Sequence, residues 1–223
     1  MNRVCVLVEG DTEASFVDSI LRPEFERAAK AVLLYPVLFR KQGGSFNYEK
    51  CQKVILRALK QDRSVHITTM VDFYGMPKDW PGRDQANQCH NYIEKANVIE
   101  DSILKNITES LGRSFNPHRL IPYVQMHEFE ALLFSSPVQL AEGLGDKELS
   151  SAFQTIRNKF PTPEEINDRY EKCPSRRIIS IFQGFKKTIN GITAARRIGL
   201  DTMWRECPHF NEWVTKLENL GNR

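Results

Sequence analysis

The 223-residue sequence contains no long apolar segment. A helix that crosses a membrane needs about 18 consecutive apolar residues. The run VCVLV at residues 4–8 spans only five and ends directly at Glu9. This run is also too short for the apolar part of a secretory signal. We therefore expect a protein that does not associate with a membrane and resides in the cytoplasm.

Cysteines are few and scattered. The five residues, which form no CxxC pair, are Cys5, Cys51, Cys89, Cys173 and Cys207. An odd number of widely separated cysteines favours neither a disulfide framework nor a cysteine-based zinc site, so we expect reduced thiols. The hydrophobic content of 41% and the charged content of 26% are ordinary for a globular protein.

The sequence also lacks internal repeats and low-complexity tracts, and its length fits one globular unit. The net charge of +3 is small, but residues 169–205 contain nine Lys or Arg and only two acids. Basic pairs recur there about every ten residues, at 176–177, 186–187 and 196–197. These pairs fit a surface that binds nucleic acid, and they equally fit an ordinary solvated surface. Gly184 and Gly191 argue against one continuous helix through them.

Strand-like and helix-like patterns alternate through the first half of the chain. Strands are predicted at residues 2–9, 32–40, 65–72 and 119–125, and helices at 15–29, 48–61 and 85–111. This alternation predicts an α/β fold with a mostly parallel central sheet of about four strands, flanked by helices. Pro36 places the second strand at an edge. Residues 1–136 are expected to form this core, and residues 137–223 a helical C-terminal region packed on it.

Acidic residues follow three of the predicted strands. Glu9 ends the first strand, Asp72 ends the third, and His127, Glu128 and Glu130 follow the fourth. Because the carboxyl ends of parallel strands lie at one edge of a sheet, these side chains are expected to converge. Clustered carboxylates require a balancing cation, and hard oxygen ligands suit Mg²⁺ or Mn²⁺. Such an ion can activate water and bind phosphate oxygens during phosphodiester cleavage.

Each of these acids also has a structural explanation. Glu13 lies four residues after Glu9 and could face the same site, but with Asp11 or Thr12 it could equally cap the first helix. Asp72 could form a turn before Gly75. Glu128 and Glu130 are not expected to point the same way, so one of them is an ordinary first-turn acid. Glu128 is favoured at the site because it lies closer to the strand end, and His127 fits a buried or capping position equally well.

The stretches VEGDTE and VDFYG resemble the Toprim fold of topoisomerases, primases and overcoming-lysogenization-defect nucleases. Further stretches are similar to a Toprim-like family of unknown function that occurs beside AAA-type ATPases in bacterial defence islands. They are VEGxTE, DxYG, HEFEALLF, INxxxEKCPSRR, GFKKTINGITAARRIGL and CPHFNEW, and they cover nearly the whole chain.

The resemblance implies a Mg²⁺- or Mn²⁺-dependent endonuclease that cleaves DNA or RNA as the effector of an ATPase-coupled anti-phage system. It implies catalytic roles for Glu9, Glu13 and Asp72, with Glu9 and Asp72 as metal ligands, and the position of Glu128 near the strand end makes it a further catalytic candidate. The sequence departs from the family pattern at Tyr74, where a second aspartate is expected. Glu128 or Glu130 would then supply the missing ligand. Otherwise the chain is a non-catalytic adaptor that binds a partner ATPase or nucleic acid.

Basic residues near the expected site are candidates for binding the substrate phosphates. They are Lys41 after the second strand, Arg176 and Arg177 at the start of a helix, and Lys187. Ser175 follows Pro174 and is placed to cap that helix, which would hold the two arginines near the site. The aromatic residues Trp204, Phe210 and Trp213 fall near helical spacing and are expected in the core.

Overall fold

The computed structural model describes residues 2–28, 30–39, 47–167 and 172–222. Its strands form one parallel sheet in the order β2-β1-β3-β4, and β5 also pairs with β3. The strands are β1 (Asn2–Val8), β2 (Val32–Leu38), β3 (His66–Asp72), β4 (Leu120–Ile121) and β5 (Val124–Gln125). The prediction of an α/β fold with a parallel sheet of about four strands is therefore confirmed.

Prolines shape both sides of the sheet. Among the described strands β2 pairs only with β1, so Pro36 lies on an edge strand as predicted. Pro122 separates β4 from β5, which together occupy the place of the predicted fourth strand. Because proline has no backbone N–H, it cannot donate to the ladder with β3 at this point. The central strands β1 and β3 contain no proline.

The helix after β1 runs without a break from α1 (Asp11–Phe16) through the π-helical turn η1 (Val17–Leu21) into α2 (Arg22–Arg27). Pro23 is the second residue after the π-helical turn. Its ring and missing N–H disrupt the regular i to i−4 bonding pattern, and the wider turn accommodates this disruption. The expected cap at Asp11 or Thr12 is wrong, because Gly10 occupies the N-cap position and Asp11 already belongs to the helix.

The connections from β2 to β3 and from β3 to β4 form helices on the opposite face of the sheet. The predicted helix over residues 48–61 is confirmed as α3 (Tyr48–Gln61). The single helix predicted from residue 85 to 111 is wrong at its start, because the chain forms α4 (Arg83–Ala86) and then α5 (Tyr92–Leu111). The Asn91 side chain accepts the backbone N–H of Glu94 at 2.9 Å and so caps α5 anew.

The remainder of the chain is helical. Its elements are η2 (Pro117–Arg119), η3 (Phe129–Ser135), α6 (Pro137–Gly143), η4 (Lys147–Leu149), α7 (Ser150–Arg157), η5 (Pro163–Glu165), α8 (Pro174–Ile181), η7 (Lys187–Gly191), α9 (Ile192–Ile198), α10 (Leu200–Glu206), α11 (Pro208–Asn219) and η8 (Leu220–Asn222). The stretch HEFEALLF, residues 127–134, enters the buried 3-10 helix η3 at Phe129. No helix in the described ranges is long and apolar enough to cross a membrane, and all five cysteines are free.

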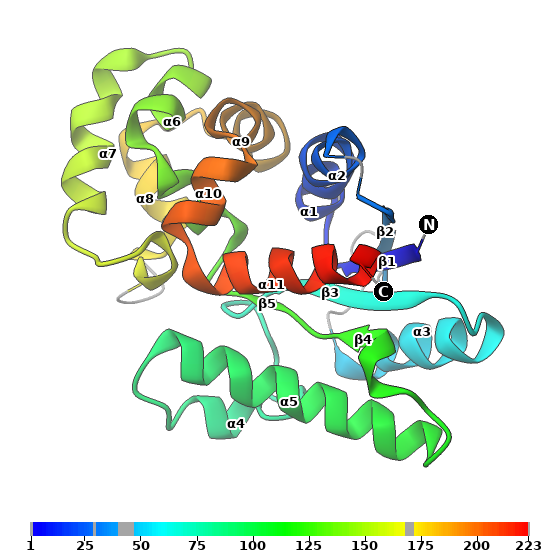
Figure 1. The fold of residues 1–223 in the computed structure, drawn as a ribbon. Helices are drawn as coiled ribbons and strands as arrows, with labels where there is room; N and C mark the ends of the chain where they lie inside the picture. The colour runs from blue at the N-terminus through cyan, green and yellow to red at the C-terminus, as the bar shows by residue number, and fades with distance from the viewer. Residues whose placement is uncertain (1, 29, 40–46, 168–171, 223) are drawn as a thin grey trace.

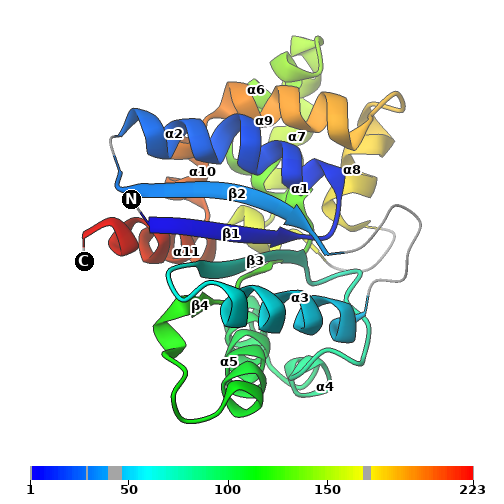
Figure 2. The ribbon, with the colours of Figure 1, turned by 90° about the vertical axis from the view of Figure 1, so that its right-hand side faces the viewer.

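The sheet lies between two helical layers (Figures 1 and 2). On one face, Val4, Val6 and Met70 pack with α1, α2 and the C-terminal helices, and on the other Cys5 and Leu7 pack with α3 and α5. Alternate residues of β1 therefore enter different hydrophobic clusters, as expected for a strand buried on both faces.

The last long helix, α11, packs directly against the sheet. Trp213 is 2% exposed, and its Nε1 donates to the Oγ1 atom of Thr68 on β3 at 2.7 Å. Its ring stacks on Tyr123 with centroids 4.3 Å apart. Phe210 is fully buried beside them, whereas Trp204 is only partly buried. The two chain ends lie close together (Figure 2), and the Asn2 side chain donates to the Leu220 carbonyl.

A buried ionic group holds the start of α11. The Glu164 carboxylate accepts the backbone N–H groups of His209 and Phe210, each at 3.0 Å. His209 Nε2 also lies 2.9 Å from Glu100 Oε1 on α5. These acids satisfy helix-terminal N–H groups and a buried imidazole, so they are assigned a structural role.

We predict that replacing Trp213 with Phe lowers the free energy of unfolding by about 2 kcal/mol. The substitution removes a buried hydrogen bond and leaves the Thr68 hydroxyl with one partner fewer. Trp204→Phe is the matched control, because that indole donates to Asn211 in a partly exposed place. Urea denaturation followed by circular dichroism measures both, and an equal loss in the two variants would contradict the assigned role of α11.

Candidate functional site

The acids that follow β1 and β3 lie beside each other at the carboxyl edge of the sheet. Val8 pairs with Met70, so Glu9, the next residue, and Asp72, the last residue of β3, extend from neighbouring strands. In the order β2-β1-β3-β4 the chain reverses its direction of travel across the sheet at β1. The gap between β1 and β3 is therefore the topological switch point, where ligands of such sheets bind.

Asp72 is 7% exposed, and its Oδ1 accepts the backbone N–H of Phe129 at 2.9 Å. Burial, followed by the negative charges of Glu9, Glu13 and Glu130, raises the pKa of Asp72 well above its ordinary value. Electrostatic coupling of this kind requires that the four carboxylates share one region. We call Glu9, Glu13, Asp72, Glu128 and Glu130 the acid cluster.

Glu13 belongs to the first turn of α1 and is 6% exposed. Its Oε2 lies 3.0 Å from the place where a Cβ atom on Gly10 would stand. The carboxylate thus folds back over the turn between β1 and α1, on the same side as Asp72. A glycine at residue 10 leaves room for this arrangement, since any side chain would press on the carboxylate.

Glu128 and Glu130 reach the cluster from the start of η3. Glu128 Oε2 accepts the backbone N–H of Ser175 at 2.9 Å, and Glu128 Oε1 lies 3.9 Å from Lys187 Nζ. Glu130 Oε2 lies 3.0 Å from the same ammonium. The expectation that only one of these acids faces the site is therefore wrong. The backbone at Glu128 is extended before the 3-10 turn begins, which brings both side chains to Lys187.

Lys187 is the cation that contacts these acids. It begins the π-helical turn η7, and its side chain is 45% exposed. Burial opposes the charge on the ammonium, but Glu130, Glu128 and Asp72 together outweigh it and raise the pKa of Lys187. The lysine predicted to bind substrate thus lies beside the carboxylates and remains accessible from solvent.

Glu130 is the most buried acid of the cluster, at 1% exposure. Its Oε1 has no hydrogen-bond partner among the residues that the structure describes. Burial raises the pKa of Glu130 to about 7, even though Lys187 lowers it. Glu130 therefore changes its charge near neutral pH.

His127 is buried and packs edge-on against the Phe73 ring, with centroids 5.6 Å apart. Burial, together with the positive charges of Lys95 and Arg83, lowers the pKa of His127 to about 4. The imidazole is therefore neutral at pH 7, and its position matches the core alternative from the sequence.

The other predicted phosphate contacts lie in different surroundings. Lys41 lies outside the described residues. Arg176 is exposed on the first turn of α8. Arg177 donates through Nε to the Lys172 carbonyl at 2.6 Å, and its guanidinium lies 5.2 Å from the centre of the Phe160 ring. Arg177 therefore supports the local structure. The expected cap from the Ser175 side chain is wrong. The carboxylate of Glu128, which lies outside α8, accepts the backbone N–H of Ser175 in the first turn of this helix.

The three basic pairs do not lie on one helix. The chain leaves α8 before Gly184, forms the π-helical turn η7 and then enters α9. In the pair at 196–197, Arg197 contacts a different acid, because its Nε donates to Glu142 Oε2 on α6 at 2.9 Å. Lys187, from the middle pair, contacts the acid cluster through its ion pairs with Glu128 and Glu130.

The metal prediction rests on the chemistry of the donors. Within the described residues, no three Asp, Glu, His or Cys side chains converge closely enough to hold one ion. The acid cluster nevertheless supplies the hard oxygen atoms that Mg²⁺ and Mn²⁺ prefer, including the unbonded Glu130 Oε1. Ligation by Glu9, Asp72, Glu128 and Glu130 thus stays a prediction.

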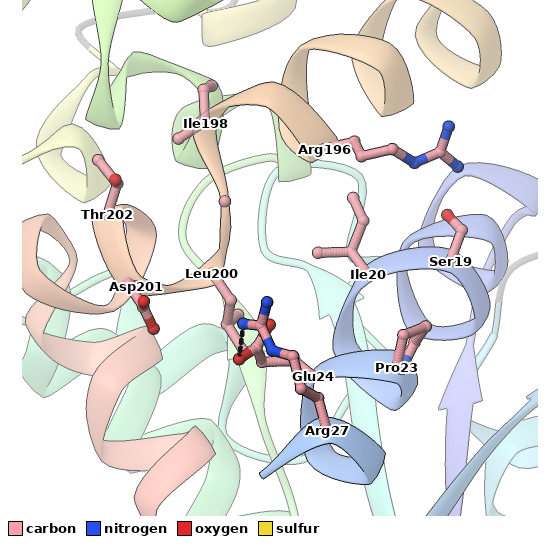
Figure 3. Close-up of a pocket in the computed structure, with 11 residues that line it drawn as sticks. Ser19, Ile20, Pro23, Glu24, Arg27, Arg196, Ile198, Leu200, Asp201 and Thr202 are labelled. Carbon is pink, nitrogen blue, oxygen red and sulfur yellow. Dashed lines mark hydrogen bonds and ion pairs between the residues drawn. The ribbon is translucent and has the colours of Figure 1, made fainter.

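A pocket of about 370 Å³ lies elsewhere, between the helix η1–α2 and the junction of α9 with α10 (Figure 3). Arg27 forms an ion pair with Glu24 at its rim, and Arg196 and Asp201 also line it. Its positive and negative side chains are therefore balanced, and it contains no residue of the acid cluster.

We predict that Glu130→Gln stabilises the protein at pH 8 and has little effect at pH 5. The folded-state pKa of about 7 exceeds the ordinary value of 4.5, so between these values the folded protein binds more protons than the unfolded chain. Stability contributed by Glu130 therefore falls as the pH rises through this window. Urea denaturation should show a gain of roughly 1–3 kcal/mol at pH 8. A variant that is equally stable or less stable than the wild type at pH 8 would contradict the assigned burial penalty.

Comparison with known proteins identifies one family and one solved structure. No curated protein matches the sequence. The C-terminal region of the OLD protein from Xanthomonas campestris pv. campestris aligns with a TM-score of 0.43 and 14% identity, over 100% of this chain and 97% of that chain. The family model for a domain of unknown function, DUF4276, matches residues 8–218. Because this match spans almost the whole chain, the protein belongs to the DUF4276 family.

Proposed function

We propose that this protein is a metal-dependent nuclease that hydrolyses phosphodiester bonds in DNA or RNA at the acid cluster. The observation that carries the proposal is the buried position of Asp72 among other acids. It lies buried at the end of a central strand, its pKa is raised by burial and by neighbouring acids, and Lys187 is the cation nearby. Perturbed carboxylates gathered at a switch point are typical of catalytic sites.

The charge balance supports a bound divalent cation. One ammonium, Lys187, contacts Glu128 and Glu130, while Glu9, Glu13 and Asp72 add further negative charge to the same region. A divalent cation would stabilise the ionised form of carboxylates that are gathered this closely. Asp72 and Glu9, with Glu128 or Glu130, would hold Mg²⁺ or Mn²⁺. When bound, such an ion supplies an acidified water molecule and compensates charge on the phosphate.

The chain's own residues would bind and orient the substrate. Lys187 is half-exposed beside the carboxylates, so its ammonium can donate to a non-bridging phosphate oxygen. Arg176 projects from the first turn of α8, which Glu128 anchors, and would contact a neighbouring phosphate. Glu130 is suited to accept a proton near neutral pH, because its pKa is about 7.

The biological role is inferred from the motifs. VEGDTE, HEFEALLF, CPSRR and CPHFNEW resemble a Toprim-like family that occurs beside AAA-type ATPases in bacterial defence islands. On that resemblance we extend the proposal to an effector that acts with such an ATPase against phage, in the cytoplasm.

A specific observation favours a second function, that of a non-catalytic adaptor. Glu128 is bonded to Ser175 and also lies near Lys187, and Tyr74 replaces the second aspartate of the Toprim motif. In the described part of the chain no three-ligand group is preformed. An adaptor would use the same edge to bind nucleic acid or the ATPase without cleaving a bond.

We predict that cleavage of DNA or RNA requires Mg²⁺ or Mn²⁺ and that Asp72→Asn and Glu9→Gln each reduce the rate at least about a hundredfold. The assay uses single-stranded DNA, duplex DNA and RNA, with each metal or with EDTA, with and without the neighbouring ATPase. Glu109→Gln, an exposed acid on α5, is the matched control and should leave the rate unchanged.

Two outcomes separate the candidate functions. Cleavage that persists unchanged in both variants excludes the acid cluster as the active site. Binding of a nucleic acid or of the ATPase that is disturbed by the same substitutions, with no cleavage under any condition, supports the adaptor.

We also predict that Lys187→Met moves the pH profile of cleavage to higher pH. Removal of the ammonium removes the charge that lowers the pKa of Glu130, so a higher pH is needed to ionise the acid. Lys186→Met is the control, because this neighbouring lysine is exposed and forms no ion pair with a described residue. Equal profiles for the two variants would show that Lys187 does not act on Glu130.

A further inference from the structure

A second pocket, of about 540 Å³, lies at the other end of the sheet. It is formed by the ends of α3 and α5 and by the turn that leads into β4, near the amino ends of β3 and β4. The acid cluster lies at the carboxyl ends of these strands, so the two places are separate. The residues that line the pocket are Leu59, Lys60, Arg63, Leu111, Ser114, Phe115, Asn116 and Arg119.

The charged residues that line this pocket are all positive. Lys60 and Arg63 are exposed and form no ion pair with any residue in the described ranges. The nearest acid in sequence, Asp62, is engaged elsewhere, since its carboxylate bonds Arg3 and accepts the N–H of Ser64 at 2.8 Å. The positive charge of the pocket is therefore not neutralised by a carboxylate in its wall.

Arg119 forms a fixed part of that wall. Its guanidinium donates to the carbonyl oxygens of Val65 at 3.1 Å and Leu59 at 3.2 Å, and also to that of Asp62. Carbonyl oxygens hold the side chain in place but leave its positive charge intact. Burial and the nearby charge of Arg63 both lower the pKa of Arg119, although Asp62 opposes them. Arg63 and Arg119 line the same pocket, and an anion bound there would be attracted by both guanidinium groups.

Apolar and aromatic side chains also line the pocket. Leu59 is 3% exposed, and Leu111 and Phe115 are half-buried beside it. Ser114 and Asn116 add polar groups at the rim. A phosphate can pair with the guanidinium and ammonium groups while a planar base packs against the aromatic ring.

The pocket in Figure 3 shows that this charge pattern is not general for the molecule. There, two arginines are accompanied by two acids, and Arg27 is paired with Glu24. The pocket at α3 and α5 has no acid in its lining.

We propose that the pocket between the ends of α3 and α5 binds a nucleotide through its phosphate. The ligand is either a free nucleoside phosphate or the terminal phosphorylated nucleotide of a nucleic-acid strand. Both sources present the same chemistry, a phosphate attached to a planar base through a sugar. This binding site is distinct from the acid cluster and does not depend on cleavage.

The test measures binding by the full chain in EDTA, so that metal-dependent cleavage does not contribute. The probes are adenosine monophosphate, adenosine, and one short oligonucleotide with either a 5′-phosphate or a 5′-hydroxyl end. We expect that the phosphorylated probes bind and that Arg63→Glu weakens this binding at least about tenfold, since it replaces a charged donor with a repelling group. Arg57→Glu makes the same charge change at an exposed position on α3, six residues before Arg63 and outside the pocket lining, and should alter binding less than about twofold.

The outcomes are decisive in both directions. Tighter binding of the phosphorylated oligonucleotide assigns the site to a strand end, and tighter binding of the mononucleotide assigns it to a free nucleotide. The proposal is overturned if neither phosphorylated probe binds, if adenosine binds as tightly as its monophosphate, or if Arg57→Glu weakens binding as much as Arg63→Glu. Lys60→Glu repeats the test at an independent residue, with circular dichroism to verify folding. The binding measurement remains a test of this pocket even if the protein has no nuclease activity.

Discussion

Asp72 lies at the end of a central strand, where burial and neighbouring carboxylates oppose its ionisation. The rest of the site is arranged around this repulsion. Glu9 and Glu13 come from the strand end and helix next to it, Glu128 and Glu130 from the turn after β5, and Lys187 from a π-helical turn much later in the chain. Five acids and one lysine meet because a sheet gathers its carboxyl ends, and because the C-terminal helices pack over the same edge.

The lysine links the two halves of the molecule. Without its ammonium, Glu130 at 1% exposure would lose the ion pair that offsets its burial, and a buried acid without such a partner is costly in a protein interior. Glu128 makes a second link. One of its carboxylate oxygens lies near the Lys187 ammonium, and the other accepts the backbone N–H of Ser175 in the first turn of α8. The charge state of the cluster is therefore coupled to the placement of the helix that carries Arg176.

Much of the fold could be predicted from local patterns. Short apolar runs between helical stretches indicated the parallel sheet, and Pro36 indicated its edge strand. The break at Pro122 was not predicted, because residues 119–125 were read as one strand. The acids at the strand ends were predictable because parallel strands must deliver their carboxyl ends to one edge. Lys187 as their partner was not predictable, since its pairing with Glu130 spans 57 residues and depends on how η7 packs. The same holds for the uncompensated cations near Arg119, which local sequence presents only as scattered basic residues.

The position of α11 has a consequence for the order in which the protein is made. Trp213 bonds Thr68 on β3, the strand that ends in Asp72, and the same helix covers Tyr123. A ribosome produces residues 208–219 after all of the strands, so the part of β3 that α11 covers stays uncovered until then. A nascent chain would therefore display the carboxylates without the packing that fixes their geometry. Assembly of the site would therefore wait until α11 has been synthesised and has packed on the sheet.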